Sequence, residues 1–75
     1  MIVTVTVSWP FSEDFDFASR WPPIRQVLLR HGFDSRATTS SSFVMFECLD
    51  GTAGVLQSEI PKIDSQFSVE WTPRH

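Results

Sequence analysis

The fold is decided by a short stretch near the start of the chain, residues 2–9, which read IVTVTVSW. Apolar and small polar residues alternate there, with Val3, Val5, Val7 and Trp9 on one side and Thr4, Thr6 and Ser8 on the other. A period of two residues with β-branched side chains is typical of a half-buried β-strand. We therefore predict a strand that ends at Pro10 and turns its valines towards a core.

A helix is predicted after this strand. Pro22 and Pro23 suit the first turn of a helix, where a missing N–H costs little, although Ser19 or Arg20 offers an earlier start. Gly32 supplies the left-handed residue that ends many helices. One face of this helix is marked by residues spaced at i, i+3, i+4 and i+7, namely Ile24, Val27, Leu28 and His31.

The second half of the chain repeats the pattern of strands around one helix. In chain order we predict a strand over 33–38, a polar loop over 38–42, a strand over 43–49, a helix over 52–59 that Pro61 closes, a strand over 66–71 that Pro73 stops, and a frayed tail at 74–75.

The predicted order is β-α-β-β-α-β, a single α+β domain over residues 1–75 that resembles the ferredoxin-like fold. Right-handed crossovers place the first and third strands in the centre of a four-stranded antiparallel sheet, with both helices on one face. The predicted core comprises Val3, Val5, Val7, Ile24, Val27, Leu28, Val44, Phe46, Leu56, Phe67, Val69 and Trp71. The predicted open face carries Thr4, Thr6, Ser8, Arg36, Phe43, Met45, Glu47, Ser68 and Glu70.

Charge and cysteine content narrow the range of functions. Nine acidic and six basic residues give a net charge of −3, which argues against nonspecific binding to nucleic acid or to an anionic membrane. Cys48 is the single cysteine, so an intramolecular disulfide is impossible and a reducing cytoplasm is expected. No apolar run approaches the roughly 20 residues that span a bilayer, and we expect no membrane association.

The sequence lacks the patterns of the common ferredoxin-like catalysts and metal carriers. No Cys-x-x-Cys follows the first strand, and Cys48 is expected to face the core. The segment after that strand is acidic and lacks glycine, so it would repel phosphate. The spacing of Glu13, Asp14 and Asp16 matches no magnesium-ligand pattern. We therefore predict no enzymatic activity, no cofactor and no metal.

A partial RNA-binding signature lies on the third strand. Residues 43–46, Phe-Val-Met-Phe, resemble the end of the RNA-recognition motif. Thr39, Ser40 and Ser41 replace the basic residue, the glycine and the exposed aromatic of that family, and Thr4 stands where a second stacking aromatic belongs. A degenerate RNA-recognition module is the least favoured alternative.

The segment from Trp9 to Trp21, WPFSEDFDFASRW, holds five of the ten aromatic residues and three of the nine acidic ones. We expect Trp9, Trp21 and either Phe15 or Phe17 to extend the core. Burying unpaired carboxylates is costly, so the acidic residues would then face solvent. This predicts a docking surface for a basic protein partner, centred on Glu13, Asp14 and Asp16, with Glu47 and Glu70 of the open face as the next candidates.

A very small, acidic, cysteine-poor single domain of this predicted topology resembles the ferredoxin-like anti-CRISPR proteins of phages, such as those against type I-C systems. The resemblance concerns architecture, not a motif. It implies a non-enzymatic inhibitor in the cytoplasm of a bacterial host that binds a CRISPR surveillance complex and blocks its DNA-binding surface. The alternative is a small regulatory or scaffold module that binds a host protein or self-associates through Phe43 and Met45. We expect a monomer rather than a dimer.

Overall fold

The computed structural model describes residues 1–34 and 36–73. The elements follow one another as β1 (Ile2–Ser8), α1 (Phe17–Arg30), β2 (Thr38–Thr39), β3 (Phe43–Leu49), α2 (Asp50–Ile63) and β4 (Ser68–Pro73). The order βαββαβ is the one that the sequence predicts, and all the pairings between strands are antiparallel.

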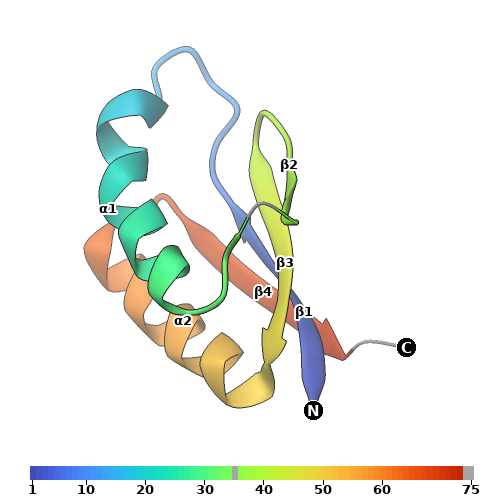
Figure 1. The fold of residues 1–75 in the computed structure, drawn as a ribbon. Coiled ribbons are helices and arrows are strands. Elements are labelled where there is room, and N and C mark those ends of the chain that lie inside the picture. Colours follow the sequence, from blue (N-terminus) through green and yellow to red (C-terminus); the bar gives the residue numbers. More distant parts are fainter. Residues whose placement is uncertain (35, 74–75) are drawn as a thin grey trace.

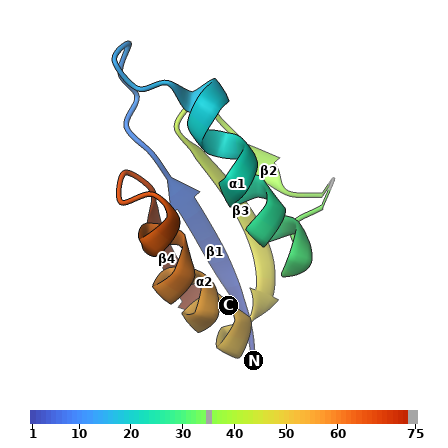
Figure 2. The ribbon, with the colours of Figure 1, turned by 90° about the vertical axis from the view of Figure 1, so that its left-hand side faces the viewer.

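The strands form one sheet in the order β2-β3-β1-β4, with β1 and β3 in the centre as predicted. Both helices lie on the same face of the sheet (Figures 1 and 2). The protein therefore has the ferredoxin-like α+β architecture. The opposite face is bare of helices, so the residues that alternate with the core positions of β1, β3 and β4 face away from the core.

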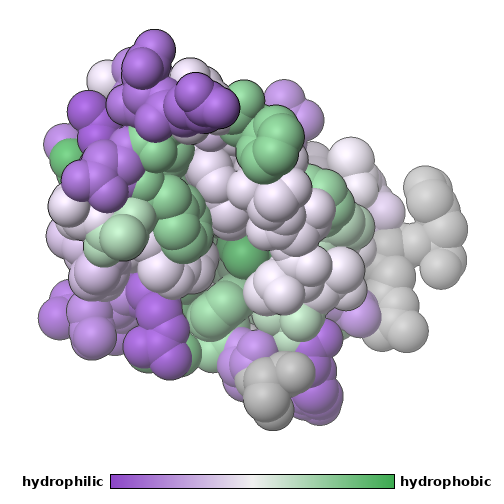
Figure 3. Space-filling view, turned by 90° about the horizontal axis from the view of Figure 1, so that it is seen from above, coloured by the Kyte–Doolittle hydropathy of each residue, from purple (hydrophilic) through white to green (hydrophobic). Residues whose placement is uncertain are grey.

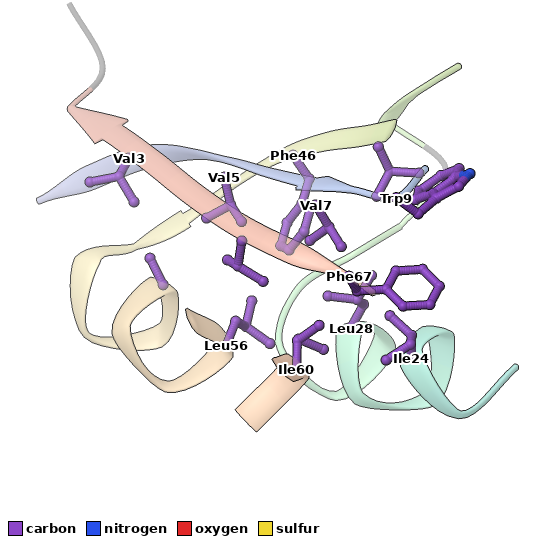
Figure 4. Packing of buried hydrophobic residues seen from close by; sticks show 13 residues of the cluster. Val3, Val5, Val7, Trp9, Ile24, Leu28, Phe46, Leu56, Ile60 and Phe67 are labelled. Carbon is purple, nitrogen blue, oxygen red and sulfur yellow. The ribbon is translucent and has the colours of Figure 1, made fainter. Parts of the chain in front are cut away.

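The core fills the space between the sheet and the two helices. Val3, Val5 and Val7 are fully buried and project from β1 towards the helices (Figure 4). The buried cluster comprises Val3, Val5, Val7, Trp9, Ile24, Leu28, Val44, Phe46, Ala53, Leu56, Ile60, Phe67 and Val69. Of the predicted core, only Val27 and Trp71 are half-buried, at its margin.

Helix α1 begins at Phe17, so the prediction that it starts at Pro22 is wrong. Asp16 caps the helix, and its carboxylate accepts hydrogen bonds from the Ser19 N–H at 3.4 Å and the Ser19 hydroxyl at 2.7 Å. Pro22 and Pro23 lie inside the helix. They leave two carbonyls of the first turn without helical donors, and because that turn is exposed, water can reach those carbonyls. The end of α1 is as predicted, since Gly32 adopts a φ of 106°.

The predicted strand over 33–38 is also wrong. The chain instead turns after Asp34, whose side chain accepts a hydrogen bond from the Arg36 N–H at 2.8 Å and whose carbonyl accepts one from the Ala37 N–H at 3.1 Å. Ser35 lies outside the described residues. In the described part of this stretch, Thr38 pairs with Met45 of β3, and Thr39 beyond it pairs with Val44. A local turn closed by hydrogen bonds to Asp34 thus takes the place of most of the predicted strand pairing.

Helix α2 is longer than the predicted 52–59, because it runs through Pro61 to Ile63. Strand β4 is shifted two residues towards the C-terminus of the predicted 66–71 and includes Pro73. A proline is tolerated there because β4 lies at the edge of the sheet. The predicted tail at 74–75 lies outside the described residues.

Candidate functional site

Four of the five aromatic residues from Trp9 to Trp21 pack against the core: Trp9 is buried, as predicted, and Phe15, Phe17 and Trp21 are partly buried against it. The Trp9 ring lies with its centroid 4.7 Å from that of Phe17, 5.6 Å from Trp21 and 5.8 Å from Phe67. Phe15 contacts Phe67 edge-on at 5.6 Å. Such pairs stabilise beyond the area that they bury, and they fix both ends of the segment to the body of the protein.

Hydrogen bonds tie the start of this segment to the β2–β3 hairpin. The Trp9 backbone N–H donates to the Ser42 carbonyl at 3.0 Å. Its indole Nε1–H donates to the Ser41 carbonyl at 3.1 Å. Trp9 is only 8% exposed, so this residue joins the sheet, the hairpin and α1 at one point.

Arg20 holds the end of the segment. Its guanidinium lies 5.1 Å from the centre of the Phe15 ring, and Nη1 lies 3.4 Å from Oδ1 of Asp64 after α2. The Asp64 carboxylate also accepts a hydrogen bond from the Gln66 N–H at 3.0 Å. This bridge connects α1 with the α2–β4 connection, next to the acidic residues.

The three predicted acidic residues of the segment are exposed, but they do not share one role. Glu13 and Asp14 lie in the loop before α1, whereas Asp16 is the N-cap of that helix. The Ser19 hydrogen bonds, chiefly the one from its hydroxyl, lower the pKa of Asp16 below its ordinary value of 3.8. Asp16 is therefore a structural residue beside the candidate surface, and Glu13 and Asp14 are the carboxylates left for a partner.

Several other carboxylates are paired with cations. Asp34 pairs with Arg36 at 2.9 Å, Glu59 with Lys62 at 3.8 Å, and Asp64 with Arg20. Among residues 1–34 and 36–73, Glu13, Asp14 and Glu70 make no ion pair within 4.0 Å. The uncompensated negative charge is thus concentrated at the loop before α1 and at one point of β4.

Glu47 and Glu70 lie on the open face of the sheet, as predicted. Glu47 is opposite Thr4 of β1, and Glu70 is opposite Thr6 on the other side of the same strand. The central strand therefore separates the two carboxylates, and the loop that carries Glu13 and Asp14 lies beyond the end of β1. The structure gathers the predicted residues into two places, a loop and a sheet face.

A hollow of about 480 Å³ lies beside Glu47, between the open face and the α1–β2 connection. Arg36 reaches its rim from the turn after Asp34, not from a strand. The hydrogen bonds between the Asp34 and Arg36 side chains raise the pKa of Arg36 and lower the pKa of Asp34. The lining residues are Ile2, Thr4, Gly32, Asp34, Arg36, Ala37, Thr38, Met45, Phe46 and Glu47.

One exposed residue was missed by the sequence reasoning. Phe11 is 80% exposed, the largest exposed fraction of any large hydrophobic residue in the described chain. It precedes Glu13 and Asp14, and its chain neighbours Pro10 and Ser12 line a hollow of about 180 Å³ together with Asp14, Phe15, Arg20 and Gln66. Phe11 belongs to no periodic pattern in the sequence, so the sequence does not indicate whether its side chain is buried or exposed. Figure 3 views the molecule from this end, where hydrophobic residues are exposed between groups of hydrophilic residues.

The remaining candidates have simple positions. Phe43 and Met45 lie on the open face and are half-buried. Cys48 is half-buried against the core, and burial raises the pKa of its thiol.

Within 1–34 and 36–73, no group of three or more His, Cys, Asp or Glu side chains could hold a metal ion. In the same residues, no helix has the length and hydropathy needed to cross a membrane.

Comparison with known proteins gives no match: no family model, no curated protein and no solved structure is significantly similar to this chain.

Proposed function

We propose that the protein is a non-enzymatic binding protein that docks onto a basic protein surface through the loop before α1. One observation carries the proposal: Glu13 and Asp14 are exposed and lack a cation partner in the described residues, while the aromatics on both sides fix their loop. Charges mounted on a fixed loop lose little conformational entropy on binding. They also steer a partner of opposite charge and raise its association rate.

A DNA-binding protein is the partner class that this surface suits, because a groove that holds DNA must carry positive charge. The architectural resemblance to anti-CRISPR proteins narrows the proposal further. In that form, the protein is a stoichiometric inhibitor that binds a CRISPR surveillance complex of a bacterial host and plugs part of its DNA-binding surface.

Neutralising the two loop carboxylates tests the proposal. We expect the variant Glu13→Gln/Asp14→Asn to bind a purified type I-C surveillance complex about tenfold more weakly than the natural protein, because two exposed charge pairs are lost. Binding is measured on a biosensor at low and high salt. The difference between the two proteins should shrink at high salt, because salt screens exposed charges.

Glu59→Lys provides the matched control, since it changes the net charge by the same amount on the outer side of α2. Unchanged affinity of this control, together with weaker binding of the loop variant, supports the loop as the contact. Equal loss in both variants would mean that only net charge matters. If the loop variant binds normally, Glu70→Gln and Glu47→Gln transfer the same test to the open face.

Self-association is the second candidate function, and one observation favours it. Ile2 and Leu49 face each other across β1 and β3 on the open face and are 41% and 57% exposed. The edge strand β4 is less available to a second copy. There Gln57 Nε2 donates to the Val69 carbonyl at 3.2 Å, and Pro73 has no N–H to offer. Sedimentation of the pure protein distinguishes the two functions.

A further inference from the structure

We infer that Phe11 is the anchor of the docking surface, a side chain that enters an apolar pocket flanked by basic residues on the partner protein. The inference rests on the proposed function and deepens it. Phe11 is 80% exposed, whereas the exposed hydrophobic residues of the helices, Leu29, Val55 and Ile63, are 41–47% exposed. The rest of the protein therefore covers much less of the Phe11 side chain than of those three.

The loop around Phe11 is held in place on both sides. On one side, Trp9 is fixed by its two hydrogen bonds to the hairpin carbonyls. On the other side, the Ser12 hydroxyl accepts a hydrogen bond from the Asp14 N–H at 3.2 Å, and the Ser12 carbonyl accepts one from the Phe15 N–H at 3.1 Å. An aromatic ring presented by an ordered loop needs little further ordering on binding.

The chemistry of such a ring is that of an interface hot spot. Aromatic residues near the centre of an interface, surrounded by polar groups that exclude water, contribute most of the binding energy. Here Phe11 is followed within three residues by Glu13 and Asp14, which supply a charged rim. The two carboxylates would therefore speed the approach of a basic partner, and burial of the Phe11 ring would strengthen the complex once it has formed.

Charge decides between the possible occupants of this surface. One possible occupant is a second copy, because the chain neighbours of Phe11, Pro10 and Ser12, line a hollow of about 180 Å³. In such a pairing, the Phe11 side chain of each copy would lie against the hollow of the other copy. However, two copies joined in this way would bring their Glu13 and Asp14 carboxylates together, and like charges at close range are unfavourable. A basic partner pairs with the same carboxylates, so we assign the surface to a different protein.

The experiment measures binding of Phe11 variants to the purified type I-C surveillance complex. We expect Phe11→Ser to bind about 10- to 100-fold more weakly, because a buried aromatic contact is lost. Phe11→Trp should restore most of the affinity. Leu49→Ser, which removes a 57% exposed residue at the far end of the open face, should bind normally. Melting curves establish that each variant is folded.

Three results would overturn the inference. If the natural protein binds and Phe11→Ser binds equally well, the anchor is wrong while the proposed function stands. If Leu49→Ser alone is weakened, the contact is the open sheet face. If the pure protein dimerises and Phe11→Ser is monomeric, the occupant is a second copy. Absence of binding by the natural protein is a different outcome, since it rejects the surveillance complex as the partner, and the inference with it.

Discussion

Asp16 has a role that its acidic neighbours do not share. Glu13 and Asp14 face solvent, whereas Asp16 accepts two hydrogen bonds from Ser19 at the start of α1. Reversing all three charges would therefore damage the helix as well as the surface. A variant that changes only Glu13 and Asp14 alters the surface charge and leaves the helix cap intact.

We predict that Asp16→Ala lowers the melting temperature at pH 7 by about 5 °C, because the N-cap of α1 is lost. Asp16→Asn should melt close to the natural protein, since asparagine is also a good N-cap. Circular dichroism melts of the three proteins measure the difference. No change in Asp16→Ala would contradict the assigned cap.

The pH dependence of this effect follows from the lowered pKa of Asp16. A carboxyl whose pKa is lower in the folded state stabilises the protein fully above its unfolded value, here near 3.8. That stabilisation is lost as the pH falls through the lower folded value. The difference in melting temperature between the natural protein and Asp16→Ala should therefore narrow below about pH 3.8. A constant difference would contradict a lowered pKa of Asp16.

At the scale of elements, the sequence predicts the four strands and two helices in the right order because each main strand has a clear period of two. The boundaries that fail do so for local reasons. Pro22 and Pro23 mark a helix start by propensity, but Asp16 and Ser19 form a cap one turn earlier. Residues 33–38 alternate well enough for a strand, but the side chain of Asp34 satisfies the backbone locally. In both places the side chain of an aspartate, Asp16 or Asp34, satisfies the backbone locally and outweighs the signal of the surrounding sequence.

The position of Pro23 inside α1 gives an element-scale prediction. Proline removes a helical hydrogen bond and disfavours helical geometry at the preceding residue. Pro23→Ala should therefore increase the free energy of unfolding by about 1–2 kcal/mol. This value is the gain in helix stability minus the smaller loss that arises because alanine leaves the unfolded chain more freedom than proline does. Urea denaturation followed by circular dichroism measures this value.

Pro10→Ala is the matched control for that variant. Pro10 is also exposed but lies between β1 and α1, outside any helix. Its replacement should be neutral or cost less than about 1 kcal/mol, because only the restriction of the unfolded chain is lost. If Pro23→Ala destabilises the protein as much as Pro10→Ala, α1 does not run through Pro23 in solution.

At the scale of the whole molecule, stability and the docking surface depend on the same residue. A chain of 75 residues buries a smaller share of its surface than a larger domain does, and its expected stability is only about 4–11 kcal/mol. Trp9 belongs to the core, caps the end of β1 and holds both the hairpin and the loop of Phe11. The sequence predicts its burial from the alternation of residues 2–9, but not its bonds to Ser41 and Ser42, which join distant parts of the chain.

We predict that Trp9→Phe lowers the free energy of unfolding by about 1–3 kcal/mol, because the indole hydrogen bond and part of the packing are lost. The variant should stay folded, yet bind the partner more weakly, since the loop loses its tie to the hairpin. Trp71→Phe is the control: it loses a similar indole bond, to Gln57 at 3.3 Å, but on the edge strand away from the loop. It should cost less than about 1 kcal/mol and leave binding unchanged. Equal binding by the two variants, measured beside their urea curves, would show that Trp9 supports the core without ordering the docking loop.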